Sequence, residues 1–146
     1  MSNNERNLDL FSKLIEINKE RISGYEKAAE ATEAIDADIR SMFMRMASQS
    51  RQFIKELSQH VSTLGKVAHD TGVAVIDLTT ELTTQNRKLL LDFCLYVEQG
   101  AQQAYDLILT VLDEKKILVP EVAKLVKIQR VKIGKSMDSL QSFRLA

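Results

Sequence analysis

The chain holds four long stretches in which apolar residues recur at the spacing of one helix face, and very little that would interrupt a helix. Its 146 residues include a single proline, Pro120, and five glycines. Apolar residues three and four positions apart form a continuous stripe along an α-helix. The stripes predict helices over residues 8–34, 36–64 and 85–112, and a fourth helix that begins at Pro120. The sequence therefore predicts an all-α fold.

The expected lengths of these helices restrict how they can pack. A helix of about 25–28 residues is about 40 Å long, and such helices bury their stripes by lying side by side in a bundle. The first and second helices are joined by a short link, as are the third and fourth, so each pair is expected to be antiparallel. We therefore expect one domain over residues 1–146, an up-down four-helix bundle. Its one long crossover, between the second and third helices, is the connectivity of ferritin-like bundles.

Within this crossover, residues 66–84 carry an ambiguous local pattern. HDTG is typical of a turn, and VAVIDL fits either a short strand or a helical turn. The helical neighbourhood favours a short crossing helix or an ordered connection.

Each predicted helix contributes one set of residues to the core. Taken in chain order, the sets are Phe11, Leu14, Ile15, Ile22, Tyr25, Ala28, Ala29 and Thr32; Ile39, Met42, Phe43, Met46, Phe53, Leu57, Val61 and Leu64; Leu90, Phe93, Cys94, Val97, Ala101, Ala104, Ile108 and Val111; and Val122, Leu125, Val126, Ile133, Met137, Leu140 and Phe143.

Near the middle of all four helices the apolar stripe turns polar. The residues on or beside it are Asn18, Gln49 with Ser50, Glu98 and Gln129. Metal-binding four-helix bundles place carboxylates and histidines at this level, whereas this chain places mostly amides there. The contrast indicates a metal-site scaffold without its metal.

The ligands of a di-metal site are missing from the sequence. A di-iron bundle uses a Glu from each of two helices and a Glu-x-x-His from each of the other two. The chain has no Glu-x-x-His and only two histidines. His60 follows Glu56 by four residues, but we expect this pair at the solvent edge near a helix end, and His69 in a turn. We therefore expect no metal ligand, no cofactor and no catalytic residue, and Glu98 is the best remaining acid.

Two interpretations of the mid-bundle residues stay open. Glu98 is either a boundary residue or a buried carboxylate, and a buried carboxylate needs a partner or a raised pKa. Asn18, Gln49, Gln129 or Tyr25 could hydrogen-bond it. Alternatively, Asn18 and Gln129 only fix the register of the helices. We expect the hydroxyls of both core tyrosines, Tyr25 and Tyr105, to face polar neighbours.

Overall composition argues against several classes of protein. Twenty basic and twenty acidic residues cancel, so no global field attracts nucleic acid or an anionic membrane. No apolar run approaches the roughly 20 residues that span a bilayer, and the beginning of the chain lacks the apolar core of a signal peptide. The single cysteine, Cys94, cannot form an internal disulfide and fits a reducing compartment. We expect a cytoplasmic protein in which Cys94 is a small buried residue.

Charge is nevertheless uneven along the chain. Residues 116–146 hold seven basic and two acidic residues, whereas residues 1–35 hold five basic and seven acidic ones. The simpler interpretation is that the acidic first helix lies beside the basic fourth helix. The alternative is a basic face, built from Lys124, Lys127, Lys132 and Lys135, for nucleic acid or phosphates. It lacks aromatic interleaving and any known nucleic-acid motif, so we do not expect a nucleic-acid partner.

Three segments resemble a bacterial ferritin-like four-helix-bundle family of unknown function. They are LIEINKERISGYEKAAE, FMRMASQSRQFIKELSQHVSTLG and VEQGAQQAYD. The GY at 24–25, the FIKEL at 53–57 and the EQG at 98–100 carry the resemblance, which implies the fold and no particular activity. Members of the family often have acidic residues where this chain has Gln49 and Ala101, which argues further against a metal site here.

The sequence therefore favours a non-catalytic helical bundle with a structural or protein-interaction role and without a di-metal site. One alternative is a di-iron oxidoreductase or storage protein of the same type, in which Glu98, Glu56 and His60 would be the first ligands to consider. The other is a nucleic-acid-associated stress protein that uses its basic fourth helix. We also expect a homodimer, because Met44, Phe11 and Leu91 could leave apolar surface outside the core.

Overall fold

The computed structural model describes residues 3–32, 37–63, 86–115 and 120–145. Helix α1 spans Asn3–Thr32, α2 spans Ala37–Thr63, α3 spans Arg87–Lys115 and α4 spans Pro120–Leu145. The residues in these ranges form no strand. The predicted all-α class is confirmed. The fourth helix begins at Pro120 as predicted, and the first three begin and end within about five residues of the predicted bounds.

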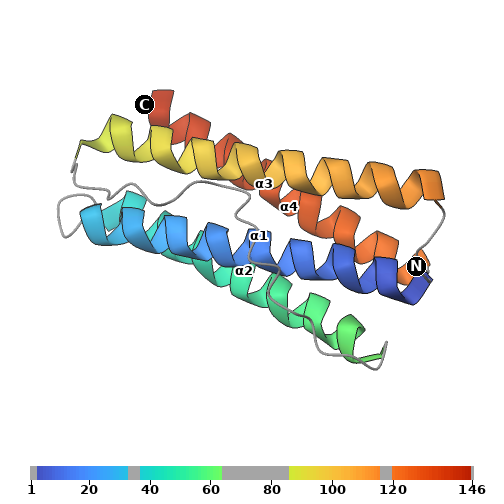
Figure 1. Cartoon of the computed structure of the whole chain (residues 1–146). Helices are drawn as coiled ribbons and strands as arrows, with labels where there is room; N and C mark the ends of the chain where they lie inside the picture. Colours follow the sequence, from blue (N-terminus) through green and yellow to red (C-terminus); the bar gives the residue numbers. More distant parts are fainter. Residues whose placement is uncertain (1–2, 33–36, 64–85, 116–119, 146) are drawn as a thin grey trace.

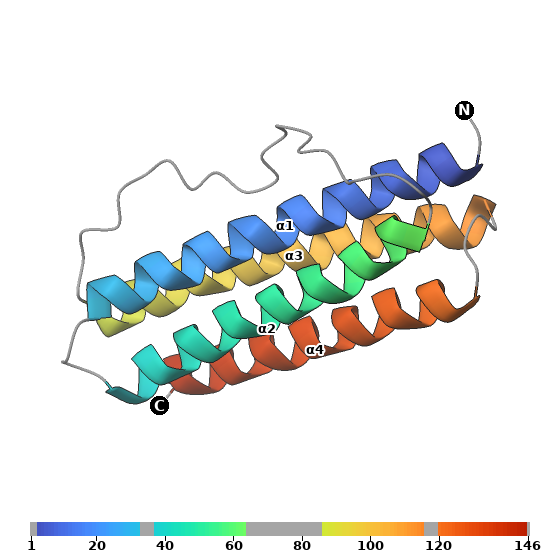
Figure 2. The ribbon, with the colours of Figure 1, turned by 90° about the horizontal axis from the view of Figure 1, so that it is seen from below.

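Each helix lies antiparallel to two neighbours, so that the four form a bundle (Figures 1 and 2). Helix α1 packs against α2 and α3, and α4 packs against the same two helices. Asn18 contacts Tyr105, and Arg21, one turn later in α1, contacts Glu98, two turns earlier in α3. Helices α2 and α3 are both antiparallel to α1, so the end of α2 and the start of α3 lie at opposite ends of the bundle. Residues 64–85, and with them the predicted crossover, the ambiguous stretch 66–84 and His69, lie outside the described residues.

The apolar core has two halves with a polar layer between them. One half packs Leu14 and Phe53 against Ile108, and the other packs Phe43 against Leu90 and Cys94. Most predicted core residues with described side chains are buried as expected. Those at the edges of the stripes are half-buried instead: Ile22, Phe93, Ala104, Val111, Leu125, Met137 and Phe143.

The surface residues proposed to mediate a dimer need correction. Phe11 and Leu91 are buried within the bundle, because helix packing covers the flank of the stripe on which each lies. Met44 is exposed, as expected. The large apolar residues exposed on α3 are instead Leu89, Tyr96 and Leu107.

The expected charge complementarity between the first and last helices is also wrong. Helices α1 and α4 occupy diagonal positions, and their backbones do not approach each other. Arg130 and Arg144 of α4 pair instead with Asp106 and Asp92 of α3. The remaining positive charge of α4 is therefore not neutralised by α1.

No helix in the described part of the chain is both long enough and apolar enough to cross a membrane.

Candidate functional site

The centre of the bundle holds a buried ion pair between Arg21 of α1 and Glu98 of α3. Arg21 lies seven residues after Leu14 and four before Tyr25, which places it on the buried stripe of α1. Glu98 likewise follows Cys94 by four residues on α3. Both side chains are 0% exposed. The structure thus answers the open question about Glu98: it is buried, and its partner is a cation rather than one of the expected amides.

The guanidinium of Arg21 has an acceptor for each of its five N–H donors. Its Nε donates to Oε1 of Glu98 at 2.5 Å, and its Nη2 donates to Oε2 of Glu98 at 3.3 Å and to Oε1 of Gln49 at 2.9 Å. Its Nη1 donates to Oγ of Ser50 at 2.8 Å and to the carbonyl of Met46 at 3.4 Å. Glu98 therefore receives a two-pronged contact, the geometry that suits a guanidinium and a carboxylate.

A chain of hydrogen bonds continues from the ion pair into all four helices. Ser50 donates to Oδ1 of Asn18 at 2.9 Å, and Nδ2 of Asn18 donates to the Tyr105 hydroxyl at 2.9 Å. Tyr105 donates to Oε1 of Gln129 at 2.6 Å. Every polar residue predicted at mid-length thus belongs to one network. Its directional contacts fix the register of α1, α2, α3 and α4 against one another.

Burial and charge together set the protonation of the groups in this layer. Burial, the largest single influence, would lower the pKa of Arg21, but the charge and hydrogen bond of Glu98 together with the two buried tyrosines outweigh it and raise that pKa, so Arg21 stays protonated. Burial, aided by the charge of Glu98, raises the pKa of Tyr25 and of Cys94 well above their usual values. Burial also raises the pKa of Tyr105. The phenols and the thiol are therefore neutral at physiological pH, and Cys94 is not an activated nucleophile.

The Tyr25 side chain lies close enough to Glu98 for that carboxylate to raise its pKa, but its hydroxyl makes no hydrogen bond of ordinary geometry with a described residue. The Tyr25 hydroxyl is the one fully buried side-chain polar atom of the described residues that has no hydrogen-bond partner. The ring packs on Phe43, with ring centroids 6.0 Å apart, and beneath the guanidinium of Arg21. Tyr25 therefore contributes packing and a cation–π contact to the site, and no hydrogen bond.

The network reaches the surface between α2 and α4. Gln49 is half-buried, and its Oε1 accepts from Arg21 and lies 3.3 Å from the hydroxyl of Ser136. Both residues line a cleft of about 320 Å³ between the two helices. The ion pair itself has no opening to solvent, since both of its side chains are inaccessible.

The residues considered as metal ligands do not converge on this centre. Oε1 of Glu56 lies 3.5 Å from Nε2 of Gln129, whereas Glu98 is held by Arg21. His60 lies near the end of α2, as expected from its position. Within the described residues, no three histidine, cysteine, aspartate or glutamate side chains gather as a metal site would require. The donor set at the centre is one carboxylate, already paired with a cation, together with amides and hydroxyls, and this set does not fit a di-metal site.

Arg21 is the central residue that sequence reasoning missed. The signal was present, because Arg21 is three residues after Asn18 and four before Tyr25 on the same helical stripe. Arginine is almost never fully buried without a partner, and this general tendency favoured a solvated position. The pair could have been found by searching the buried stripes of different helices for residues of opposite charge.

Fold and site together define an all-α four-helix bundle with a polar centre closed by an ion pair. Residues 7–110 match the family described as a domain of unknown function, DUF2383, and the chain belongs to this family. The match covers most of α1, all of α2 and most of α3, and it ends before α4. None of the curated proteins matches the sequence of this chain.

Proposed function

We propose that the protein is a non-catalytic, metal-independent bundle of the ferritin-like type, with a structural or protein-interaction role in the cytoplasm. The fold supports the ferritin-like assignment in two ways. Helices α2 and α3 run in the same direction, as a single long crossover between them requires. In addition, all four helices contribute polar residues at one level, where ferritin-like bundles place their metal ligands.

The main support for the proposal is the buried ion pair between Arg21 and Glu98. In a di-metal bundle several carboxylates neutralise the cations they hold. Here the guanidinium supplies the positive charge, and its five donors all have acceptors within the protein. Glu98 has both oxygens engaged by Arg21. A protein cation thus takes the electrostatic place of the metal. The carboxylate of Glu56, which lies beside Gln129, belongs to no group of three acidic, histidine or cysteine side chains among the described residues that could hold one.

Metal analysis of the freshly purified protein tests this proposal. We expect no stoichiometric iron, manganese or zinc. The melting temperature should be the same in buffer, in excess chelator and after incubation with Fe²⁺ or Mn²⁺, because nothing that binds the native state is removed or added. Stoichiometric metal, together with a melting temperature that chelation lowers, would show that the ligands lie elsewhere and would favour the di-iron alternative.

The proposed interaction role includes self-association as a homodimer. Leu89, Tyr96 and Leu107 are exposed, and their separations of 7 and 11 residues place them on one side of α3. A stripe of large apolar side chains on one helix can pack against the same stripe of a second copy about a two-fold axis. This surface replaces the one expected from Phe11 and Leu91.

Light scattering coupled to size-exclusion chromatography tests the dimer. We expect a dimer at high micromolar concentration that the substitution Leu107→Glu converts to a monomer. Met44→Glu is the control, since Met44 is exposed on α2, away from the stripe. A monomeric wild-type protein at that concentration, or equal effects of the two substitutions, would rule out this interface.

A further inference from the structure

The cleft between α2 and α4 has the dimensions of a small-molecule site. These two helices approach each other least closely of the four neighbouring pairs, and the space between them has a volume of about 320 Å³. Arg45 and Gln49 line it from α2, and Lys132, Lys135 and Phe143 line it from α4. The volume falls within the range of known ligand pockets, which is roughly 300–1,000 Å³.

The cleft is strongly positive. Its lining includes Arg45, Lys132 and Lys135, and no acidic residue. None of the three cations forms an ion pair within the described part of the chain. The arginines Arg130 and Arg144 of α4, by contrast, both pair with aspartates of α3. The lysines of α4 that form no ion pair with a described residue therefore face either the cleft or the outer side of the helix.

The floor of the cleft offers hydrogen-bond donors in a fixed orientation. Oε1 of Gln49 accepts from Arg21 and faces the Ser136 hydroxyl, and this identifies its other terminal atom as the amide nitrogen. Nε2 of Gln49 has no partner among the described residues. The buried ion pair thus holds Gln49, which lines the cleft, with two N–H donors that no described residue uses.

One end of the cleft is apolar. Helices α2 and α4 are antiparallel, so Met42, near the start of α2, lies across from Phe143, near the end of α4. Both line the cleft, together with Met46. Arg45 lies between Met42 and Met46 on α2, and Gln49, Lys132 and Lys135 lie further along. A ligand that fills the cleft would therefore need a negative group at one end and an apolar group at the other.

We propose that this cleft binds a small organic phosphate. The phosphate group would contact Arg45, Lys132 and Lys135 and accept from Gln49, while the apolar part would lie against Met42 and Phe143. A phosphate monoester carries nearly two negative charges and three strong acceptor oxygens, which match three cations and an amide better than a single carboxylate does. A free phosphate ester and a phospholipid headgroup share this chemistry.

Titration of the full-length protein with phenyl phosphate, followed by ¹H–¹⁵N NMR and calorimetry, tests the proposal. We expect saturable binding with a dissociation constant of about 1 mM or tighter, and shifts of the amide signals of the α2 and α4 residues that line the cleft. Arg45→Gln and Lys132→Gln should each weaken binding about three- to tenfold. Lys124→Gln removes the same charge from α4 outside the cleft and should leave binding unchanged. All three substituted side chains are exposed, so the variants should fold, and circular dichroism checks this.

Three further probes distinguish the sources and the competing explanations. Inorganic phosphate should bind more weakly than phenyl phosphate, because it leaves the apolar end empty. Vesicles that contain phosphatidic acid compete with phenyl phosphate only if a lipid headgroup fits the cleft, and failure to compete assigns the site to a free ester. The proposal is overturned if phenyl phosphate does not bind, or if Lys124→Gln weakens binding as much as Lys132→Gln. It is equally overturned if single-stranded DNA displaces phenyl phosphate and the NMR shifts caused by phenyl phosphate spread along the whole of α4, because a general basic face would then explain the binding. None of these results depends on whether the protein is metal-independent, so the two proposals can fail separately.

Discussion

Arg21 and Glu98 form a two-pronged ion pair inside the bundle although 77 residues separate them in the sequence. Neither side chain is accessible to solvent. A buried ion pair is not strongly stabilising by comparison with well-packed apolar residues, because both charges lose their hydration. Removing one member is costly, however, because it leaves the other charge buried without a partner.

The first prediction concerns this asymmetry. Arg21→Met and Glu98→Leu should each lower the free energy of unfolding by about 3–5 kcal/mol. The double variant should be considerably more stable than the sum of the two losses implies, since no unpaired charge remains. Urea denaturation at neutral pH measures all three variants. We expect the double variant to lose far less unfolding free energy than the two single losses added together.

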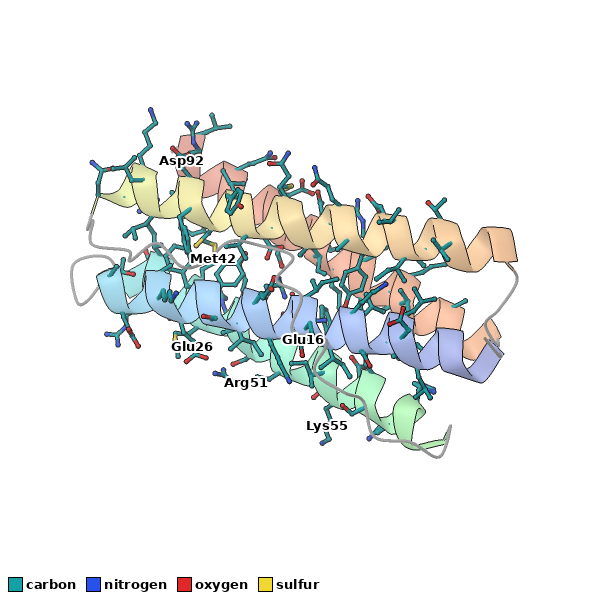
Figure 3. The ribbon with its side chains drawn as sticks, in the orientation of Figure 1. Glu16, Glu26, Met42, Arg51, Lys55 and Asp92 are labelled. Atoms are coloured by element: carbon teal, nitrogen blue, oxygen red, sulfur yellow. The ribbon has the colours of Figure 1, made fainter. Side chains whose placement is uncertain are left out.

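The pair of Arg51 and Glu26 is the control, because it also joins neighbouring helices but lies at the surface (Figure 3). The side chains of Arg51 and Glu26 are 50% and 42% exposed, so Arg51→Met should cost at most about 1 kcal/mol. Equal losses for Arg21→Met and Arg51→Met would mean that Arg21 is not buried as described.

The second prediction compares two glycines inside helices. A Cβ added at Gly24 of α1 would lie 2.9 Å from Cγ2 of Val97 on α3. One added at Gly134 of α4 would meet the end of the Arg130 side chain at 3.1 Å and Nε2 of Gln102 at an ordinary contact distance of 3.7 Å. Alanine in place of a helical glycine normally stabilises by about 0.5–1 kcal/mol. We expect this gain for Gly134→Ala, because the Arg130 side chain can move. Gly24→Ala should instead cost about 1–3 kcal/mol through overpacking.

Thermal unfolding of both glycine variants and of the double variant Gly24→Ala/Val97→Ala measures this effect. The second substitution removes the methyl group that the new Cβ would strike, so it should recover part of the loss. A stabilised Gly24→Ala would show that α1 and α3 are further apart at this level.

How far the sequence predicts this molecule depends on which physical rule dominates at each position. The helices were predictable because the 3.6-residue period, the few breakers and Pro120 all indicate the same elements. The polar layer that holds Asn18, Glu98 and Gln129 was predictable. Each of these residues interrupts the apolar stripe of its own helix and can be recognised without knowledge of the other helices. The pairing of Arg21 with Glu98 was not predictable, because it depends on the rotation of α1 relative to α3.

The surface was harder to predict for the same reason. Periodicity places Phe11 and Leu91 on the edge of a stripe, but only the packing of neighbouring helices decides whether an edge is covered. The diagonal placement of α1 and α4 depends likewise on the arrangement of all four helices. The net charges of the helices therefore led us to expect a contact between α1 and α4 that does not form. They also gave no indication of the positive cleft between α2 and α4.

The third prediction concerns stability at alkaline pH. Burial raises the pKa of Cys94, Tyr25 and Tyr105 in the folded protein. Their unfolded values are about 8.5 for cysteine and 10 for tyrosine. A group with a raised folded pKa contributes stability that is complete below its unfolded pKa and is lost as the pH rises towards the folded one. The free energy of unfolding should therefore be constant near neutral pH, begin to fall above about pH 8.5 and fall more steeply above about pH 10.

Urea denaturation across this pH range measures the decline, and two variants assign it. Cys94→Ala should remove the part that begins near pH 8.5. The Tyr96→Phe variant keeps only the two buried tyrosines. We therefore expect tyrosinate absorbance to appear only as the helical circular dichroism signal is lost. Tyrosinate that forms in a fully helical protein would contradict the burial of these side chains.

The last prediction compares the two buried tyrosines of the central layer. The Tyr105 hydroxyl accepts from Asn18 and donates to Gln129 at 2.6 Å, whereas the Tyr25 hydroxyl is buried without a partner among the described residues. Tyr105→Phe should cost about 1–3 kcal/mol, because it leaves Oε1 of Gln129 unsatisfied in the interior. Tyr25→Phe keeps the ring on Phe43 and removes an unpaired buried hydroxyl, so it should stabilise the protein by up to about 1 kcal/mol. The two substitutions delete the same atom on opposite sides of the central ion pair, and urea denaturation should give changes of opposite sign because only the Tyr105 hydroxyl has hydrogen-bond partners among the described residues. A loss at Tyr25 equal to that at Tyr105 would mean that the Tyr25 hydroxyl has a partner, for which Glu98 is the nearest candidate.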